Sequence, residues 1–171
     1  KGDIAAPMLV YWTTARSLMT RGEFDQALKI ANDGIAAAQK LEERQQGGLL
    51  DLHLLAARAL ISQRRYEEAD SHLDELLDNK RFEGWAHLLK GSVALKQDRL
   101  DLAHEEFLKA KGVWGDKILV QMSLAHTYMA RKEWDKAIPL LEALNRPVEE
   151  YTDENVSGTN NCSAEVNAFT S

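Results

Sequence analysis

The sequence predicts an all-α protein built from four stacked helix pairs, and two observations carry that prediction. The first is an internal repeat: Leu100–Ala103 and Trp134–Ala137 share a bulky residue, an acid, any residue and alanine, 34 residues apart. Tyr66–Ala69 repeats the pattern 34 residues earlier, and Phe24–Ala27 a further 42 residues before that. Repeats of this length are typical of arrays in which helix pairs stack on one another. The second is composition, because only three of the 171 residues are proline and strong helix formers are common.

Apolar spacing along the chain places the helices. From Met8 to Met19, apolar residues recur at the i, i+3, i+4 spacing of an amphipathic helix, and Thr20-Arg21-Gly22 ends that helix. Similar patterns separated by short polar turns predict the others. The helices are expected at 8–19, 24–44, 49–62, 66–78, 83–96, 100–111, 117–131 and 134–145, which gives an array over 1–146 with repeats at about 8–45, 49–81, 83–115 and 117–146.

The second helix is expected to be about two turns longer than its counterparts, because the first repeat spacing exceeds the others by eight residues. The extra residues fall at 40–48, and Gly47-Gly48 is the expected C-terminal stop. The third helix, 49–62, is so rich in leucine that both of its sides are expected to be covered. The corner after the sixth helix is expected at Val113-Trp114-Gly115-Asp116.

Small residues are expected to let the helices of a pair approach closely. They recur twelve residues apart within each repeat, so that each helix of a pair supplies one. Large residues that begin the second helices are expected to fill the corner between one pair and the next. The small residues are Ala15, Ala57, Gly91 and Ala125, then Ala27, Ala69, Ala103 and Ala137, and the large ones are Phe24, Tyr66, Leu100 and Trp134.

Residues 147–171 form a polar, acidic tail without sustained periodicity, and we expect it to be mostly irregular, with at most a short helix near 164–169. It occupies the place where a polar capping helix would close an array. We therefore expect Ile138, Leu141 and Leu144 to stay partly uncovered unless the tail or a partner covers them.

Composition limits the possible functions. The chain has 21 basic and 27 acidic residues, a net charge of −6, which argues against a general nucleic-acid binder. Direct membrane insertion is not expected, because no apolar run approaches the roughly 20 residues that span a bilayer. Cys162 is the lone cysteine, so an intramolecular disulfide is excluded. A cytoplasmic location is expected, although the chain opens with Lys1, and removal of an N-terminal segment would allow the periplasm or another compartment.

The repeated columns resemble the tetratricopeptide repeat family. Leu124-Ala125-His126-Thr127-Tyr128 resembles the Leu-Gly-x-x-Tyr of that family, and Ala103–Phe107 resembles its Ala-x-x-x-Phe. The resemblance covers residues 8–145 and implies a right-handed α-solenoid. The sequence departs from the family pattern in its overlong first repeat and in the absence or displacement of the repeat-ending proline.

The resemblance also implies that the first helix of each pair lines a concave groove that holds a peptide. Carried over to this sequence, the groove has two apolar stripes with a mostly cationic line between them. Such a groove suits an amphipathic helix or an extended segment with hydrophobic anchors and some acidic residues. The alternative is that the stripes simply pack against neighbouring helices. The expected groove residues are Trp12, Arg16, Met19, Leu54, Arg58, Ile61, Trp85, Leu88, Ser92, Leu95, Lys96, Met122, His126 and Met129.

Chemistry beyond binding is not expected. The family's lysine-and-asparagine clamp for a terminal carboxylate has no asparagine at the equivalent positions here. His53 and His87 occupy matching places in successive repeats, and no His-Glu-x-x-His or paired cysteines accompany them. His72 and His104 are expected to face solvent or to cap neighbours. No metal, cofactor, phosphate-binding loop or nucleophile elbow is predicted.

The function expected from these features is that of a non-enzymatic scaffold or adaptor that binds a protein or peptide partner. One alternative is an escort chaperone that shields a hydrophobic segment of a secreted or assembly partner in the same groove. Another is a structural oligomerisation module of a larger protein, which would associate through the uncovered last helix.

Overall fold

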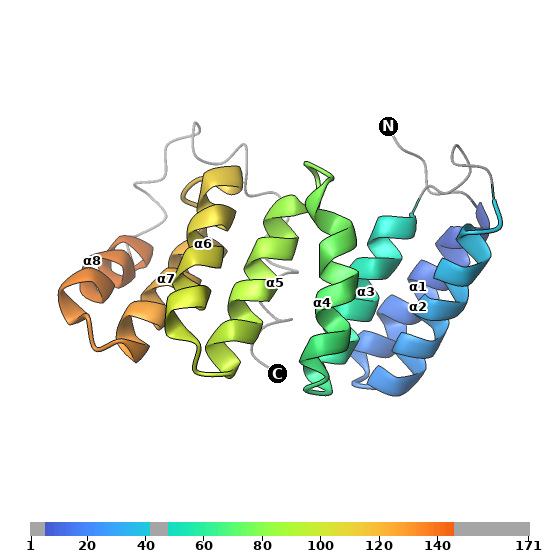
Figure 1. The fold of residues 1–171 in the computed structure, drawn as a ribbon, viewed down its shortest axis with the longest axis horizontal. Helices are drawn as coiled ribbons and strands as arrows, with labels where there is room; N and C mark the ends of the chain where they lie inside the picture. The colour runs from blue at the N-terminus through green and yellow to red at the C-terminus, as the bar shows by residue number, and fades with distance from the viewer. Residues whose placement is uncertain (1–5, 42–47, 146–171) are drawn as a thin grey trace.

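A computed structural model describes residues 6–41 and 48–145, and this part of the chain holds eight α-helices and no strand (Figure 1). The predicted all-α class is therefore confirmed. The helices are α1 Ala6–Thr20, α2 Phe24–Ala38, α3 Leu49–Ser62, α4 Tyr66–Leu77, α5 Glu83–Lys96, α6 Leu100–Trp114, α7 Ile118–Ala130 and α8 Trp134–Leu144.

The helices form four antiparallel pairs that follow one another along the long axis of the molecule (Figure 1). Each pair contacts the next through its second helix, so that α2 meets α3, α4 meets α5 and α6 meets α7. The first helices also contact one another in series, from α1 to α3, α5 and α7. We call these four helices the first-helix layer. The stacking confirms the predicted α-solenoid of helix pairs.

Each pair is joined by the same tight turn. Its central residue has a left-handed backbone, and its N–H donates to the carbonyl three residues earlier at 3.0–3.1 Å. The next N–H donates to the carbonyl five residues earlier at 2.9–3.0 Å, which completes a Schellman motif. Only the first of these turns uses glycine. The central residues are Gly22, Arg64, Asp98 and Lys132, with φ of 76°, 61°, 59° and 62°.

The small residues predicted from the repeat are all buried. Gly91 shows why size matters, because a Cβ atom built there would stand 2.6 Å from the Phe107 ring. The core is divided into three neighbouring clusters. The first lies chiefly among α1, α2 and α3, the second among α3, α4 and α5, and the third among α5, α6 and α7.

The prediction of a long second helix is wrong. Helix α2 ends at Ala38, and the N–H groups of Lys40 and Leu41 bond to carbonyls three residues earlier. This tighter winding brings Leu41 against the first core cluster, so the chain leaves the helix in a turn here, and the longer repeat spacing does not extend the helix. Residues 42–47 lie outside the described residues, and Gly48 is the N-cap of α3.

Two further expectations need correction. Helix α6 continues to Trp114, three residues beyond its predicted end, because Trp114 packs edge-on against Trp85 with ring centroids 5.0 Å apart. Trp134 fills no corner and is 55% exposed, whereas Phe24, Tyr66 and Leu100 are half-buried. The predicted tail at 147–171 lies outside the described residues, and the exact repeat boundaries stay a prediction.

Candidate protein-binding surfaces

The first-helix layer carries the residues expected to line a groove. Most of the apolar ones are half-buried, so that one side of each packs on the core and the other meets solvent. Trp12, Met19 and Ile61 pack against the first cluster, and Leu54 packs against the second. Packing and partner contact are therefore compatible uses of the same side chains. The half-buried members are Trp12, Met19, Leu54, Ile61, Trp85, Leu95, Met122 and Met129.

Leu88 does not belong to that surface. It is fully buried in the third cluster, and no part of its side chain is available to a partner. At this position, the alternative expectation is correct: the apolar side chain packs against neighbouring helices and does not line a groove. Sequence reasoning also missed Leu9, which is 44% exposed on α1. The repeat register could have found it, because Leu9 holds the position in the first repeat that Trp85 holds in the third.

The polar line between the stripes differs from repeat to repeat. The Arg16 guanidinium lies over the Trp12 ring, 4.5 Å from its centroid, so an exposed cation and an apolar surface stand together. Ser92 donates its hydroxyl to the Leu88 carbonyl at 2.8 Å, which leaves it little to offer a partner. His126 and Lys96 are exposed, and Arg58 is half-buried.

Charge is divided unequally between the two kinds of helix. Helices α1, α3, α5 and α7 together hold two acidic and four basic residues, a net charge of +2. Helices α2, α4, α6 and α8 hold twelve acidic and four basic residues, a net charge of −8. One of the two acids on the first helices, Asp51, is already engaged by Arg81 at 3.4 Å. The four first helices therefore carry a net positive charge in an acidic chain.

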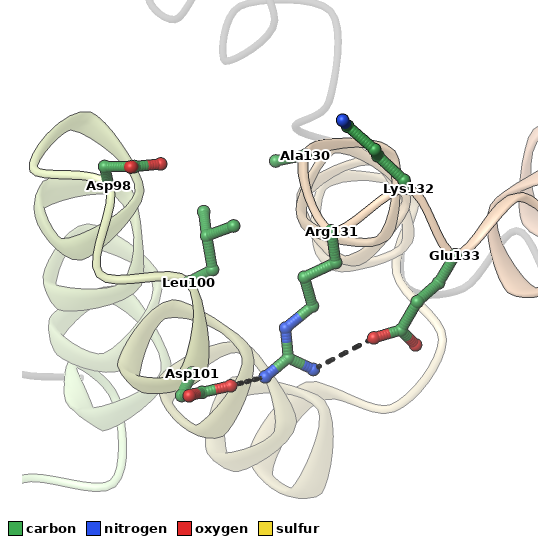
Figure 2. A pocket seen from close by; sticks show the side chains of 7 residues that line it. All are labelled: Asp98, Leu100, Asp101, Ala130, Arg131, Lys132 and Glu133. Carbon is green, nitrogen blue, oxygen red and sulfur yellow. Dashed lines mark hydrogen bonds and ion pairs between the residues drawn. The ribbon is translucent and has the colours of Figure 1, made fainter.

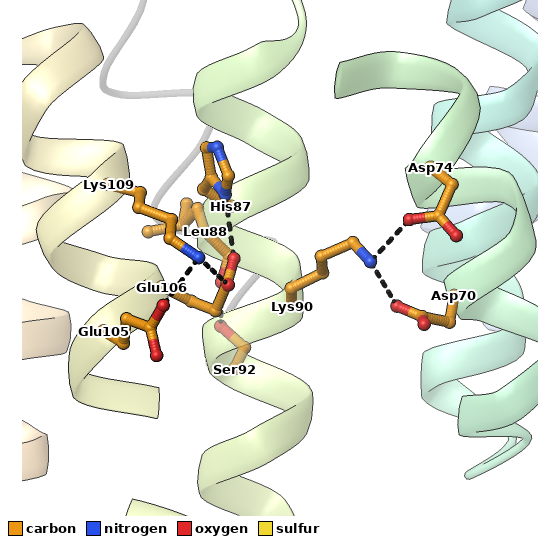
Figure 3. A network of polar contacts seen from close by, with 9 residues as sticks. All are labelled: Asp70, Asp74, His87, Leu88, Lys90, Ser92, Glu105, Glu106 and Lys109. Carbon is orange, nitrogen blue, oxygen red and sulfur yellow. Dashed lines mark hydrogen bonds and ion pairs between the residues drawn. The ribbon is translucent and has the colours of Figure 1, made fainter. Parts of the chain in front are cut away.

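One basic residue of α5 serves the contact between repeats. Lys90 Nζ lies 2.6 Å from Asp70 Oδ1 and 2.7 Å from Asp74 Oδ1, both on α4 (Figure 3). Burial tends to lower the pKa of Lys90, but the hydrogen bonds to the two carboxylates outweigh it and raise the pKa above its usual value. Lys90 thus joins the second repeat to the third.

A buried carboxylate holds α5 and α6 together. Glu106 lies 2.8 Å from His87 Nδ1 and 2.9 Å from Lys109 Nζ (Figure 3). Burial tends to raise the pKa of Glu106, but the hydrogen bonds from Lys109 and His87 outweigh it, so the pKa lies below its usual value. This arrangement is structural, because both partners are satisfied within the repeat.

Of the two alternatives expected for His72 and His104, facing solvent or capping neighbours, the first is wrong, because each contacts a residue on a neighbouring helix. His72 Nδ1 lies 3.1 Å from His53 Nδ1, and His104 Nε2 lies 3.0 Å from the Tyr128 hydroxyl oxygen. Both residues are half-buried between helices. His53 and His87 do occupy matching places, and each meets the residue 19 positions later on the second helix. Periodicity identified the first member of each pair but not the partner.

An open notch of about 610 Å³ lies between the turns of the third and fourth repeats (Figure 2). Arg131 crosses it to Asp101, and also lies 3.7 Å from Glu133. Three of the five charged residues that line the notch therefore pair with one another. The notch is lined by Asp98, Leu100, Asp101, Ala130, Arg131, Lys132 and Glu133.

Two features of the described residues bear on other classes of site. Across residues 6–41 and 48–145, no group of three or more histidine, cysteine, aspartate or glutamate side chains is placed to hold a metal ion. In the same part of the chain, no helix combines the length and apolar character needed to cross a bilayer.

The fold and these surfaces define an α-helical repeat protein. A family model described as a tetratricopeptide repeat matches residues 122–152, from the middle of α7 through α8. The match covers 31 of the 171 residues, and together with the repeated helix pairs it supports a resemblance to the tetratricopeptide repeat family. Comparisons with curated proteins and with solved structures give no match. Repeats of this family are typically non-enzymatic modules that mediate contacts between proteins.

Proposed function

We propose that the chain is a non-enzymatic scaffold or adaptor that holds an acidic, amphipathic segment of a protein partner along the first-helix layer. The observation that carries this proposal is the division of charge, +2 on the first helices against −8 on the second helices. An acidic segment is attracted to the first helices and repelled from the others, so electrostatics favours one side of the molecule.

Apolar contacts supply the second part of the recognition. The same position on the four first helices is held by Met19, Ile61, Leu95 and Met129, and each keeps part of its side chain exposed. Hydrophobic anchors of a partner can cover these surfaces, while its carboxylates meet Arg16 and Lys96. Methionine side chains adapt to differently shaped partners.

The test compares two synthetic peptides of one design, leucines at i, i+3, i+4 and i+7 with either glutamates or lysines between them. The glutamate peptide is expected to bind, and the lysine peptide is expected to bind at least about tenfold more weakly, a difference of about 1.4 kcal/mol. Fluorescence anisotropy measures both affinities, and the preference is expected to shrink as salt is added.

Variants assign the binding to the first-helix layer. Arg16→Glu with Lys96→Glu is expected to abolish binding of the glutamate peptide, because both residues are exposed on first helices. Lys29→Glu with Lys40→Glu makes the same change in net charge at exposed positions of the first repeat outside that layer, and it is expected to leave binding nearly unchanged. Equal losses in both double variants, with folding intact, would show that only net charge matters.

An escort chaperone would use the same surface differently. Its client would bind through a hydrophobic segment, so replacing the glutamates of the peptide by serine would leave its affinity unchanged. That outcome would favour the chaperone over the acidic-segment adaptor.

A further inference from the structure

Both ends of the array expose positions that are buried inside it. At the first end, Val10 of α1 is 64% exposed, although the same position in later repeats is fully buried. Those later residues are Leu52, Ala86 and Val120, each 0% exposed. In each case the second helix of the preceding pair supplies the cover, and α1 has no preceding pair in the described residues.

At the other end of the array, α8 also exposes apolar side chains. Leu141 of α8 is 37% exposed, whereas Leu73 and Phe107 hold the same position and are 1% exposed. Ile138 is 50% exposed; its equivalent Leu28 is 8% exposed, whereas the equivalents in the second and third repeats, Asp70 and His104, are polar and are exposed and half-buried. Within residues 6–41 and 48–145, no helix follows α8 to cover this face.

The contact between α6 and α7 shows how the two halves fit inside the chain. Phe107 of α6 and Val120 of α7 lie in one buried cluster. At the end of that contact, Arg131 pairs with Asp101 of the preceding repeat and also approaches Glu133 at 3.7 Å (Figure 2). Arg131 is only 20% exposed there.

The two ends of the described array carry the equivalents of these three charged residues. Arg21 holds the position of Arg131, and it lies 2.8 Å from Glu23, the equivalent of Glu133. Arg21 is 60% exposed, because the described chain places no aspartate of a preceding repeat beside it. Asp135 holds the position of Asp101 at the other end and is exposed. The charges of the two ends are therefore complementary in the register that the chain already uses.

We propose that copies of this chain associate head to tail, with α1 of one copy packed on α8 of another as α7 packs on α6. Val10 meets the Ile138 and Leu141 surface, and Arg21 pairs with Asp135 of the other copy. The intervening exposed residues of α1, Thr14 and Ser17, are small and uncharged, as close helix packing requires. Such a contact uses two different surfaces, so it extends into chains or closes into rings.

Sedimentation velocity of the full chain over a range of concentrations tests the proposal. A series of species that grows beyond the dimer with concentration is expected. A monomer at every concentration, or a dimer that never grows, would overturn head-to-tail association. The double variant Arg16→Glu with Lys96→Glu should assemble normally, because Arg16 lies roughly 120° around α1 from Val10 and Lys96 lies on α5, so neither belongs to the proposed contact. This separates the inference from the proposed function.

Two single variants make the test decisive. Val10→Asp and Leu141→Asp each charge one exposed end, so each protein alone is expected to be monomeric with an unchanged helical spectrum. An equimolar mixture of the two should form a dimer and nothing larger, because each variant keeps one intact end. Leu108→Asp, at a 45% exposed position of α6, is the matched control and should assemble like the parent. A mixture that stays monomeric would contradict the proposed register.

Charge reversal provides a second readout that keeps the apolar contact. Asp135→Arg places two arginines opposite each other and is expected to weaken assembly. Adding Arg21→Asp to the same chain should restore it. Failure of the second change to rescue the first would remove Arg21 and Asp135 from the interface.

Discussion

At the tight turns, three residues other than glycine adopt a backbone conformation that their residue types disfavour. Arg64, Asp98 and Lys132 adopt the left-handed backbone that glycine adopts at Gly22. A side chain in this conformation costs roughly 1–2 kcal/mol. The two hydrogen bonds of each Schellman motif and the packing of the following helix hold the turn in place. The sequence indicates a turn at each site, but the residue types do not reveal its conformation.

Glycine substitution at the second turn tests that cost. Arg64→Gly is expected to raise the free energy of unfolding by about 1 kcal/mol, because it removes the side-chain clash of a left-handed residue. Gly22→Ala is expected to lower it by a similar amount. Urea titrations followed by circular dichroism measure both. A destabilised Arg64→Gly protein would mean that the arginine side chain contributes more than its backbone costs.

At the scale of elements, the repeats differ in the residues at two facing positions, one on each helix of a pair. The position of His53 is filled by His87 in the third repeat and Gln121 in the fourth, and the position of His72 by Glu106 and Leu140. The second, third and fourth repeats therefore use different side chains where the two helices of the pair face each other. Burial lowers the pKa of His53, and the nearby His72 lowers it further, against the opposing effect of Glu75. Burial likewise lowers the pKa of His72, against Glu75 and Glu68.

These shifts predict an acid-sensitive second repeat. Both histidines have a lower pKa in the folded chain than in the unfolded chain, where it is about 6.5. The unfolded chain therefore binds more protons as the pH falls through that value, and stability falls with it. Replacing the pair by its fourth-repeat counterpart, His53→Gln with His72→Leu, should make the fall in melting temperature between pH 7.5 and pH 5 shallower. Parallel profiles for variant and parent would exclude the pair as a cause.

The repeat frame of the whole molecule could be predicted from the sequence, because the residues that recur are those that hold helices together. Ala103 and Ala137 are buried as expected, and the bounds of α3 and α5 match the prediction. The candidate surface was less predictable. Leu88 shares its position with half-buried Leu54 and Met122, yet local packing buries it completely. Periodicity assigns a position to a helix face, but the neighbouring side chains set how much of it remains exposed.

The end faces depend on the whole molecule in the same way. Val10 and Leu141 carry ordinary core residue types, and the sequence pattern of each matches buried equivalents. Their exposure follows only from their place at the ends of the described array. The sequence did indicate that the last helix would be partly uncovered, but nothing in its pattern indicated that Val10 of α1 would be exposed.

Methyl NMR of the four methionines tests most directly the central claim that the first-helix layer binds the partner. Met19, Met122 and Met129 are half-buried on that layer, whereas Met8 is 1% exposed and serves as an internal control. Titration with the glutamate peptide is expected to shift the methyl signals of the first three and to leave that of Met8 nearly unchanged. Binding that shifts none of the three would place the partner elsewhere and contradict the account.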